Sequence, residues 1–288
     1  MAKIEVDGLT LDYELIGDEG APPLVLTPGG RYPRDTAGVP ELGAKLADAG
    51  YRVLLWDRPG CGASDIAFPA PSESVMNAEA LVGLVRELGL KDIRLAGGSA
   101  GSRITLMAAA RMPENVRKIA IWWISGGPVG LAGLAWFYCG DQIAAASKGG
   151  MEAVVELPSW APQIAANPRI RDILLAQDPE QYIDTMQRWG KAFAYSDSSP
   201  VPGMEAADFA RLTMPILTFR SGKSDMAHTR RTSEWTHELL PNSTLIEPPW
   251  GDQEWNYVST FPIDPANRRG RFERWPMLAP MLTEFFAD

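Results

Sequence analysis

The serine in Gly97-Gly98-Ser99-Ala100-Gly101 stands in a pattern typical of a catalytic nucleophile. A serine hydroxyl can attack a carbonyl carbon when a sharp turn lifts it from a strand end into a cavity. Such a turn strains the backbone, so the residues on both sides must be small. An apolar run, Ile93 to Ala96, precedes the turn, and a helical pattern, Ile104 to Arg111, follows it. This order predicts a strand–turn–helix unit in which the amide of Ala100 faces the developing negative charge. The alternative is a flexible turn with an ordinary serine.

The elements before and after this turn alternate between strand and helix patterns. An antiparallel pair is expected first, because Ile4 to Val6 and Leu9 to Ile16 flank Asp7-Gly8, a two-residue turn signal. Further strands are predicted at residues 23–27, 51–56, 93–96 and 116–124, with helices at 39–49, 72–88 and 104–111. Such alternation predicts an α/β fold, a mostly parallel sheet with helices on both faces.

Ligands of parallel sheets bind beyond the carboxyl ends of the strands. Three loops fall at such ends: Pro28 to Gly30, the loop that starts at Asp57, and the Ser99 turn. Their convergence predicts one site at this edge of the sheet. Arg31 and Arg58 lie on these loops, where each either binds a substrate carboxylate or is an ordinary surface arginine.

The alternation stops after Gly126 and resumes at residues 214–220, followed by a helix at 229–240 and a strand at 243–247. A C-terminal helix is expected at 272–286, where Pro276 and Pro280 are candidate interruptions. Residues 128–204 show helical patterns and no strand pattern. We therefore expect an inserted helical cap, residues 128–204, on a core domain formed by residues 1–127 and 205–288. The expected cap is rich in aromatic residues, which favours a bulky apolar or aromatic substrate.

Composition excludes several function classes. The chain has 288 residues, 45% hydrophobic and 22% charged, as in globular proteins with a large core. Its net charge of −9 argues against a nucleic-acid partner. Cys61 and Cys139 cannot form a disulfide framework and show no metal-ligand spacing. Residues 1–10 lack a basic region followed by an apolar one, so we expect no secretion signal, and we expect no membrane-spanning segment because no apolar stretch is long enough. We expect a cytoplasmic protein that acts on a small molecule without a metal or other cofactor; its oligomeric state stays open.

Three motifs together resemble the α/β-hydrolase superfamily: Pro28-Gly29-Gly30, the segment from Asp57 to Ser64, and Gly97 to Ser102. The first and the last of these motifs are most similar to the prolyl-aminopeptidase-like branch. That branch has His-Gly where this chain has Pro28-Gly29 and a tryptophan where it has Ala100, so peptidase specificity is not implied.

The resemblance implies an α/β-hydrolase fold, with roles for four residues. Ser99 is the nucleophile, the amides of Gly30 and Ala100 hold the oxyanion, and Asp225 is the catalytic acid. For Asp225 the alternative is an N-cap of the following helix.

The histidine that this family places after the last strand is absent from this chain. The segment from Leu245 to Trp255 contains none, and by spacing Asp252 occupies the position, as a base or as a solvated loop charge. His228 follows Asp225 by three residues, so it is either a relocated base or a first-turn residue that packs locally. Trp250, beside the same position, is expected to contact an apolar substrate.

These patterns favour a cofactor-independent serine hydrolase that acts on an ester, lactone or amide of a small apolar or aromatic molecule. The absent histidine leaves a second class open, a lyase, isomerase, cyclase or decarboxylase of the same fold that uses Asp225 and Asp252. A non-catalytic module that binds a small molecule is a third possibility, although a pure binder has no need of a strained serine turn.

Overall fold

One sheet organises the molecule, and the computed structural model describes residues 2–223, 225–252, 254 and 270–287. Within these ranges eight strands lie in the order β1-β2-β4-β3-β5-β6-β7-β8. β1 pairs with β2 and β2 with β4 in antiparallel fashion, and the remaining neighbours are parallel. The predicted α/β fold, with a mostly parallel sheet, is confirmed. The strands are β1 (Ala2–Val6), β2 (Leu9–Ile16), β3 (Pro23–Thr27), β4 (Arg52–Trp56), β5 (Ile93–Gly98), β6 (Val116–Trp122), β7 (Ile216–Phe219) and β8 (Ser243–Ile246).

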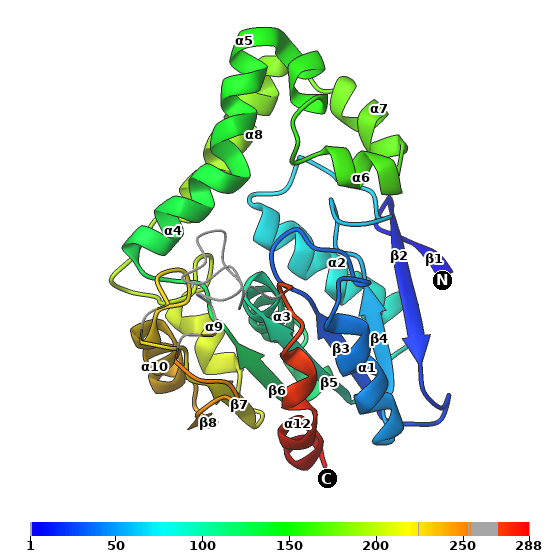
Figure 1. The fold of residues 1–288 in the computed structure, drawn as a ribbon, viewed down its shortest axis with the longest axis vertical. Helices are drawn as coiled ribbons and strands as arrows, with labels where there is room; N and C mark the ends of the chain where they lie inside the picture. The colour runs from blue at the N-terminus through cyan, green and yellow to red at the C-terminus, as the bar shows by residue number, and fades with distance from the viewer. Residues whose placement is uncertain (1, 224, 253, 255–269, 288) are drawn as a thin grey trace.

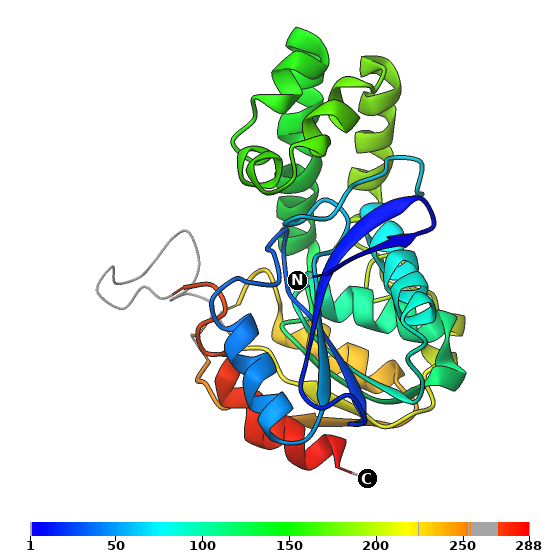
Figure 2. The same ribbon diagram turned by 90° about the vertical axis from the view of Figure 1, so that its right-hand side faces the viewer.

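Helices cover both faces of this sheet (Figure 2). Successive strand residues point to opposite faces, so Leu24 and Leu26 join one apolar core while Val25 joins the other. The first core is covered by α1 (Val39–Asp48) and α12 (Ala279–Phe286). The second is covered by α2 (Glu73–Glu87), α3 (Ala100–Arg111) and α9 (Ala206–Arg211).

The segment between β6 and α9 is helical and stands above the carboxyl ends of the parallel strands (Figure 1). Its helices share a separate apolar core that includes Tyr182, Met186 and Trp189 and also takes in Phe68 and Met76. That the segment forms a cap distinct from the core stays a prediction. The helices are α4 (Pro128–Ala135), a π-helical turn (Trp136–Gly140), α5 (Asp141–Val155), α6 (Ala161–Ala166), α7 (Arg169–Leu175) and α8 (Pro179–Lys191).

The expected elements are present, with small differences at their ends. Asp7 and Gly8 form the first turn with φ of 48° and 84°, as a two-residue hairpin requires. The helix expected at 229–240 is α10 (Arg230–Leu239). The expected C-terminal helix begins later, because prolines shorten it: a 3₁₀ turn (Trp275–Leu278) precedes α12. In the described ranges, no helix combines the length and the apolar character that crossing a membrane requires.

Candidate active site

The turn between β5 and α3 holds Ser99 with φ 57° and ψ −124°, in the strained conformation expected from its sequence. The surrounding glycines permit this close packing. A Cβ atom on Gly101 would lie 2.2 Å from the carbonyl oxygen of Thr27, and one on Gly98 would lie 2.2 Å from Nε1 of Trp122. No side chain fits at either position, so the turn can form only with glycine.

His228 lies beside this serine. The Oγ of Ser99 is 2.8 Å from Nε2 of His228, and Nδ1 of His228 is 3.1 Å from Oδ2 of Asp225. Only 2% of His228 and 5% of Asp225 are exposed. If Nδ1 carries the proton that Asp225 accepts, Nε2 is free to accept the serine proton. Ser99, His228 and Asp225 are thus joined in a row by two hydrogen-bond contacts, although they are not consecutive in the chain.

Asp225 also shapes the loop that carries the histidine. Its Oδ1 accepts hydrogen bonds from the backbone amides of Ala227 (2.9 Å) and His228 (2.8 Å). The alternative role as N-cap of α10 belongs to another residue, because Thr229 accepts from the amide of Thr232. Asp225 therefore fixes both the backbone and the ring of His228.

Two tryptophans support the imidazole from behind. Trp123, directly after β6, stacks on His228 with ring centroids 6.0 Å apart. Trp250 packs against Trp123 at 5.5 Å and is itself buried. The expectation that Trp250 contacts substrate therefore needs correction: within the described residues it packs behind the histidine and is not part of the cavity lining.

Asp252 lies in a different environment from Ser99 and His228. Its carboxylate is 47% exposed and forms an ion pair of 2.8 Å with Arg230, in the first turn of α10. The site therefore places His228, and not Asp252, beside the serine hydroxyl. That Asp252 stands at the position of the family's histidine stays a prediction.

The loop after β3 approaches the serine closely. A Cβ on Gly29 would lie 2.8 Å from Cβ of Ser99, and Gly30 has a left-handed φ of 52°. Arg58 is buried below this loop, where its Nη2 donates to the carbonyl oxygens of Gly29 (3.1 Å), Gly30 and Tyr32 (3.3 Å). Arg58 was expected either to bind a substrate carboxylate or to be an ordinary surface arginine. It does neither in the structure, because it is buried and its hydrogen bonds hold the loop after β3.

In both peptide groups whose amides are expected to bind an oxyanion, the carbonyl oxygen accepts a hydrogen bond from a side chain. The amide of Gly30 shares its peptide group with the carbonyl of Gly29, which accepts from Arg58. The amide of Ala100 shares its peptide group with the carbonyl of Ser99, which accepts from Oγ of Ser102 at 2.6 Å. A donor on the carbonyl polarises a peptide group and strengthens its N–H as a donor.

Arg31 is occupied by contacts within the protein. Its Nε is 2.8 Å from Oε1 of Glu73, at the start of α2. Its guanidinium also lies over the rings of Tyr138 and Trp160, at 4.9 and 5.4 Å from their centroids. Arg31 therefore ties the loop after β3 to the helices above, and its charge is balanced by Glu73. This corrects the expectation that its charge stands ready for a substrate carboxylate.

A cavity of about 210 Å³ opens onto Ser99 and His228. Its roof comes from Leu134 in α4 and from Phe137 and Tyr138 in the π-helical turn, a distortion often found at functional sites. Burial raises the pKa of Tyr138 to about 12, so this phenol stays neutral. The other lining residues are Gly30, Tyr32, Ala227, Arg271 and Phe272. Among the described residues, no group of three His, Cys, Asp or Glu side chains could hold a metal ion.

Comparisons with known proteins agree with this fold. A family model described as the alpha/beta hydrolase fold matches residues 22–122. A 2-hydroxy-6-oxononadienedioate/2-hydroxy-6-oxononatrienedioate hydrolase from Escherichia coli is 37% identical over 87 residues, which span 30% of this chain and 30% of that protein.

Two solved structures are similar over the whole chain. An enol-lactonase from Burkholderia xenovorans has a TM-score of 0.62 and 19% identity, and the alignment covers 100% of both chains. A 2-hydroxy-6-oxo-6-phenylhexa-2,4-dienoate hydrolase from Rhodococcus has a TM-score of 0.63 and 20% identity, covering 99% of this chain and 97% of that one. At this identity the likeness shows the fold, and the resemblance to the prolyl-aminopeptidase-like branch stays a prediction. The family match over residues 22–122, together with the strand order, shows that this protein has the α/β-hydrolase fold.

Proposed function

We propose that this chain is a cofactor-independent serine hydrolase that cleaves an ester, lactone or amide bond of a small apolar or aromatic molecule. The observation that carries the proposal is the continuous hydrogen-bonded chain from Ser99 through His228 to Asp225. A buried carboxylate, an oriented imidazole and a strained serine serve together only when the hydroxyl must become a nucleophile. The names of the relatives, which include a lactonase and hydrolases of oxo-acids, support hydrolysis beside a carbonyl group.

The first half of the reaction forms an acyl-enzyme. Nε2 of His228 takes the proton of Ser99 as Oγ bonds to the carbonyl carbon, and the carbonyl oxygen becomes an oxyanion. The amides of Gly30 and Ala100 donate to that oxygen. Asp225 stabilises the imidazolium that forms. As the tetrahedral intermediate collapses, His228 passes the proton to the leaving alcohol or amine, and the bond to the leaving group breaks.

The second half returns the enzyme to its starting state. His228 takes a proton from a water molecule, whose oxygen attacks the acyl carbon. The second tetrahedral intermediate uses the same two amides, and its collapse expels Oγ of Ser99, which regains the proton from His228. The net reaction consumes one water and yields an acid and an alcohol or amine.

The cavity supports an apolar substrate. Leu134, Phe137, Tyr138 and Phe272 surround the serine and histidine, so aromatic or aliphatic groups replace water there. We extend the proposal to the helices α4 to α8, which would act as a cap that excludes bulk water from the site while substrate is bound.

Covalent labelling tests the nucleophile. A fluorophosphonate probe is expected to label the wild-type protein at Ser99, and Ser99→Ala should lose both the label and the hydrolysis of short p-nitrophenyl esters. Circular dichroism of Ser99→Ala confirms that the variant is folded. Labelling that persists in folded Ser99→Ala, or wild-type protein that neither reacts with the probe nor hydrolyses any ester, contradicts the proposal.

A further inference from the structure

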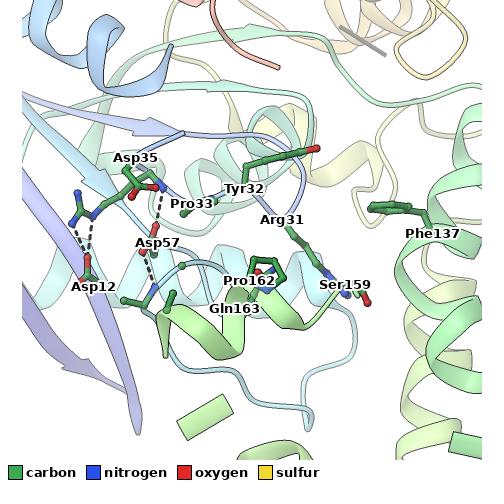
Figure 3. Close-up of a pocket in the computed structure, with 14 residues that line it drawn as sticks. Asp12, Arg31, Tyr32, Pro33, Asp35, Asp57, Phe137, Ser159, Pro162 and Gln163 are labelled. Atoms are coloured by element: carbon green, nitrogen blue, oxygen red, sulfur yellow. Dashed lines mark hydrogen bonds and ion pairs between the residues drawn. The ribbon is translucent and has the colours of Figure 1, made fainter. Parts of the chain in front are cut away.

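A second cavity, of about 390 Å³, is larger than the catalytic one. Figure 3 shows the residues that line it. It is bounded on one side by the loop that runs from Arg31 to Asp35 and on the other by Pro162, Gln163 and Ala166 of α6. Tyr32 and Phe137 line both cavities, so the two spaces meet at these two side chains.

The shared side chains differ in how firmly they are held. Tyr32 is fixed, because its hydroxyl accepts a hydrogen bond from Nε of Arg271 at 3.0 Å and its ring packs edge-on against Phe272 at 5.4 Å. Phe137 is 64% exposed, which leaves room for its ring to change rotamer. A substrate longer than the catalytic cavity therefore reaches the second cavity past Phe137.

We propose that the second cavity binds the part of the substrate remote from the reacting carbonyl, and that it selects an uncharged or cationic apolar group over one that bears a carboxylate. The inference rests on the proposed hydrolase function and adds the substrate class.

Apolar side chains form much of the lining of the second cavity. Pro33 and Ala63 face the cavity from the core loops, and Phe137, Pro162 and Ala166 face it from the helices above. These side chains offer contact area and no hydrogen bonds, as pockets for aromatic or aliphatic groups do.

The charge selection follows from the ionised groups in the same walls. Three carboxylates (Asp12, Asp35, Asp57) and two guanidinium groups (Arg31, Arg34) line the cavity. Both cations already have carboxylate partners: Arg31 pairs with Glu73, and Arg34 pairs with Asp12 at 2.9 Å and with Glu14 at 2.8 Å.

An anionic ligand therefore gains little in this cavity. It would lose hydration and meet, in the described lining, guanidinium groups whose charge is already balanced. The exposed carboxylate of Asp35 at the rim would also repel it, whereas an ammonium group would be attracted.

The space is tested with Ala166→Phe, which places a ring in the cavity from an exposed position of α6. Two long esters are used: p-nitrophenyl 5-phenylpentanoate carries the phenylalkyl chain on the acyl side of the ester bond, and 5-phenylpentyl acetate carries it on the alcohol side. In Ala166→Phe we expect kcat/KM to fall by about tenfold for at least one of these two esters. For p-nitrophenyl acetate it should stay within about twofold. Ala165→Phe, the adjacent exposed residue outside the lining, is the matched control and should leave all three esters unchanged.

The charge selection is tested on wild type with long esters that end in phenyl, 4-carboxyphenyl or 4-(aminomethyl)phenyl groups. The kcat/KM of the carboxyphenyl ester should be about tenfold lower than that of the other two esters. Asp35→Asn should reduce this difference in kcat/KM. Two results would overturn the inference: a carboxyphenyl ester with the same kcat/KM as the other two esters, or an Ala166→Phe variant that hydrolyses both long esters as well as wild type does. Neither result affects the proposed catalytic role of Ser99, which is tested separately by hydrolysis of p-nitrophenyl acetate.

Equilibrium binding separates failure of the inference from failure of the catalytic proposal. Calorimetry with 5-phenylpentan-1-ol, which cannot be cleaved, should show weaker binding to Ala166→Phe than to Ala165→Phe or wild type. Equal binding to all three proteins counts against the second cavity whether or not any ester is hydrolysed.

Discussion

At the scale of single residues, the molecule separates two candidate bases that the sequence left open. His228 has a buried ring between Ser99 and Asp225, whereas Asp252 is half exposed and bound to Arg230. A base must lie within hydrogen-bond reach of the proton that it removes. His228 meets this condition in the structure.

Substitution of the two residues should therefore have unequal effects. His228→Gln is expected to lower kcat by roughly 10³-fold or more, because the serine loses its proton acceptor. Asp252→Asn should leave kcat within about twofold, and His237→Gln, the other histidine, serves as the control. Steady-state kinetics on p-nitrophenyl acetate provide the measurement. A large loss in Asp252→Asn with little change in His228→Gln would reverse the assignment of the base.

Arg58 offers a second prediction at this scale, as a positioning residue. Its guanidinium donates to the carbonyl of the peptide group that carries the amide of Gly30. Arg58→Lys retains the charge but loses the fork of donors, so we expect kcat to fall roughly tenfold with KM little changed. Affinity for a boronic acid, which forms a tetrahedral adduct with serine, should fall by a similar factor.

A matched control is available in Arg94, a buried arginine that donates to the carbonyl of Phe286 at 3.0 Å. Arg94→Lys should leave kcat and boronic-acid affinity unchanged. If both variants lose the same activity, or if Arg58→Lys raises only KM, Arg58 has no special effect on the oxyanion amides.

At the scale of elements, the serine turn depends on glycines that allow two backbones to approach. Gly101, in the first turn of α3, lies so close to Thr27 at the end of β3 that a methyl group has no space. The approach brings the loop after β3 against Ser99. The turn thus links the nucleophile and the loop through backbone contact.

The same logic predicts opposite effects for two glycine substitutions. Gly101→Ala should lower the free energy of unfolding by roughly 1–3 kcal/mol and reduce hydrolysis, because the backbones must separate. Gly133 is an exposed residue of helix α4, and a Cβ atom added to it would have no neighbouring atom within 4 Å. Gly133→Ala should therefore raise the free energy of unfolding by about 0.5–1 kcal/mol. Urea unfolding measures both. Equal stability of the two variants would contradict the close approach at the turn.

At the scale of the whole molecule, strand order assembles the site. β3, β5, β6 and β7 are consecutive neighbours in the sheet and parallel to one another. Their carboxyl ends therefore lie side by side, and the loops that follow them carry Gly30, Ser99, Trp123 and His228. The helices α4 to α8 stand over the same edge, and Arg31 connects them to the core through Glu73 and Tyr138.

The local parts of this architecture could be predicted from sequence. Apolar periodicity and glycine positions act within a few residues, so strands, helices and the Ser99 turn follow from short segments. Asp225 was a candidate because, in the family that the motifs resemble, the catalytic acid follows the strand at which the alternation resumes, here β7. The burial of Arg31 and Arg58 was not predicted, since partners distant in the sequence decide it.

The sequence by itself thus determined the α/β fold, the serine turn and a short set of candidate residues. Only the tertiary structure decided which candidate meets the serine, because Ser99 and His228 are 129 positions apart in the chain. It also placed Trp250 behind the histidine and Asp252 against Arg230. The physical reason is that backbone preferences depend on neighbouring residues, whereas proton transfer requires a contact that exists only after the strands have paired.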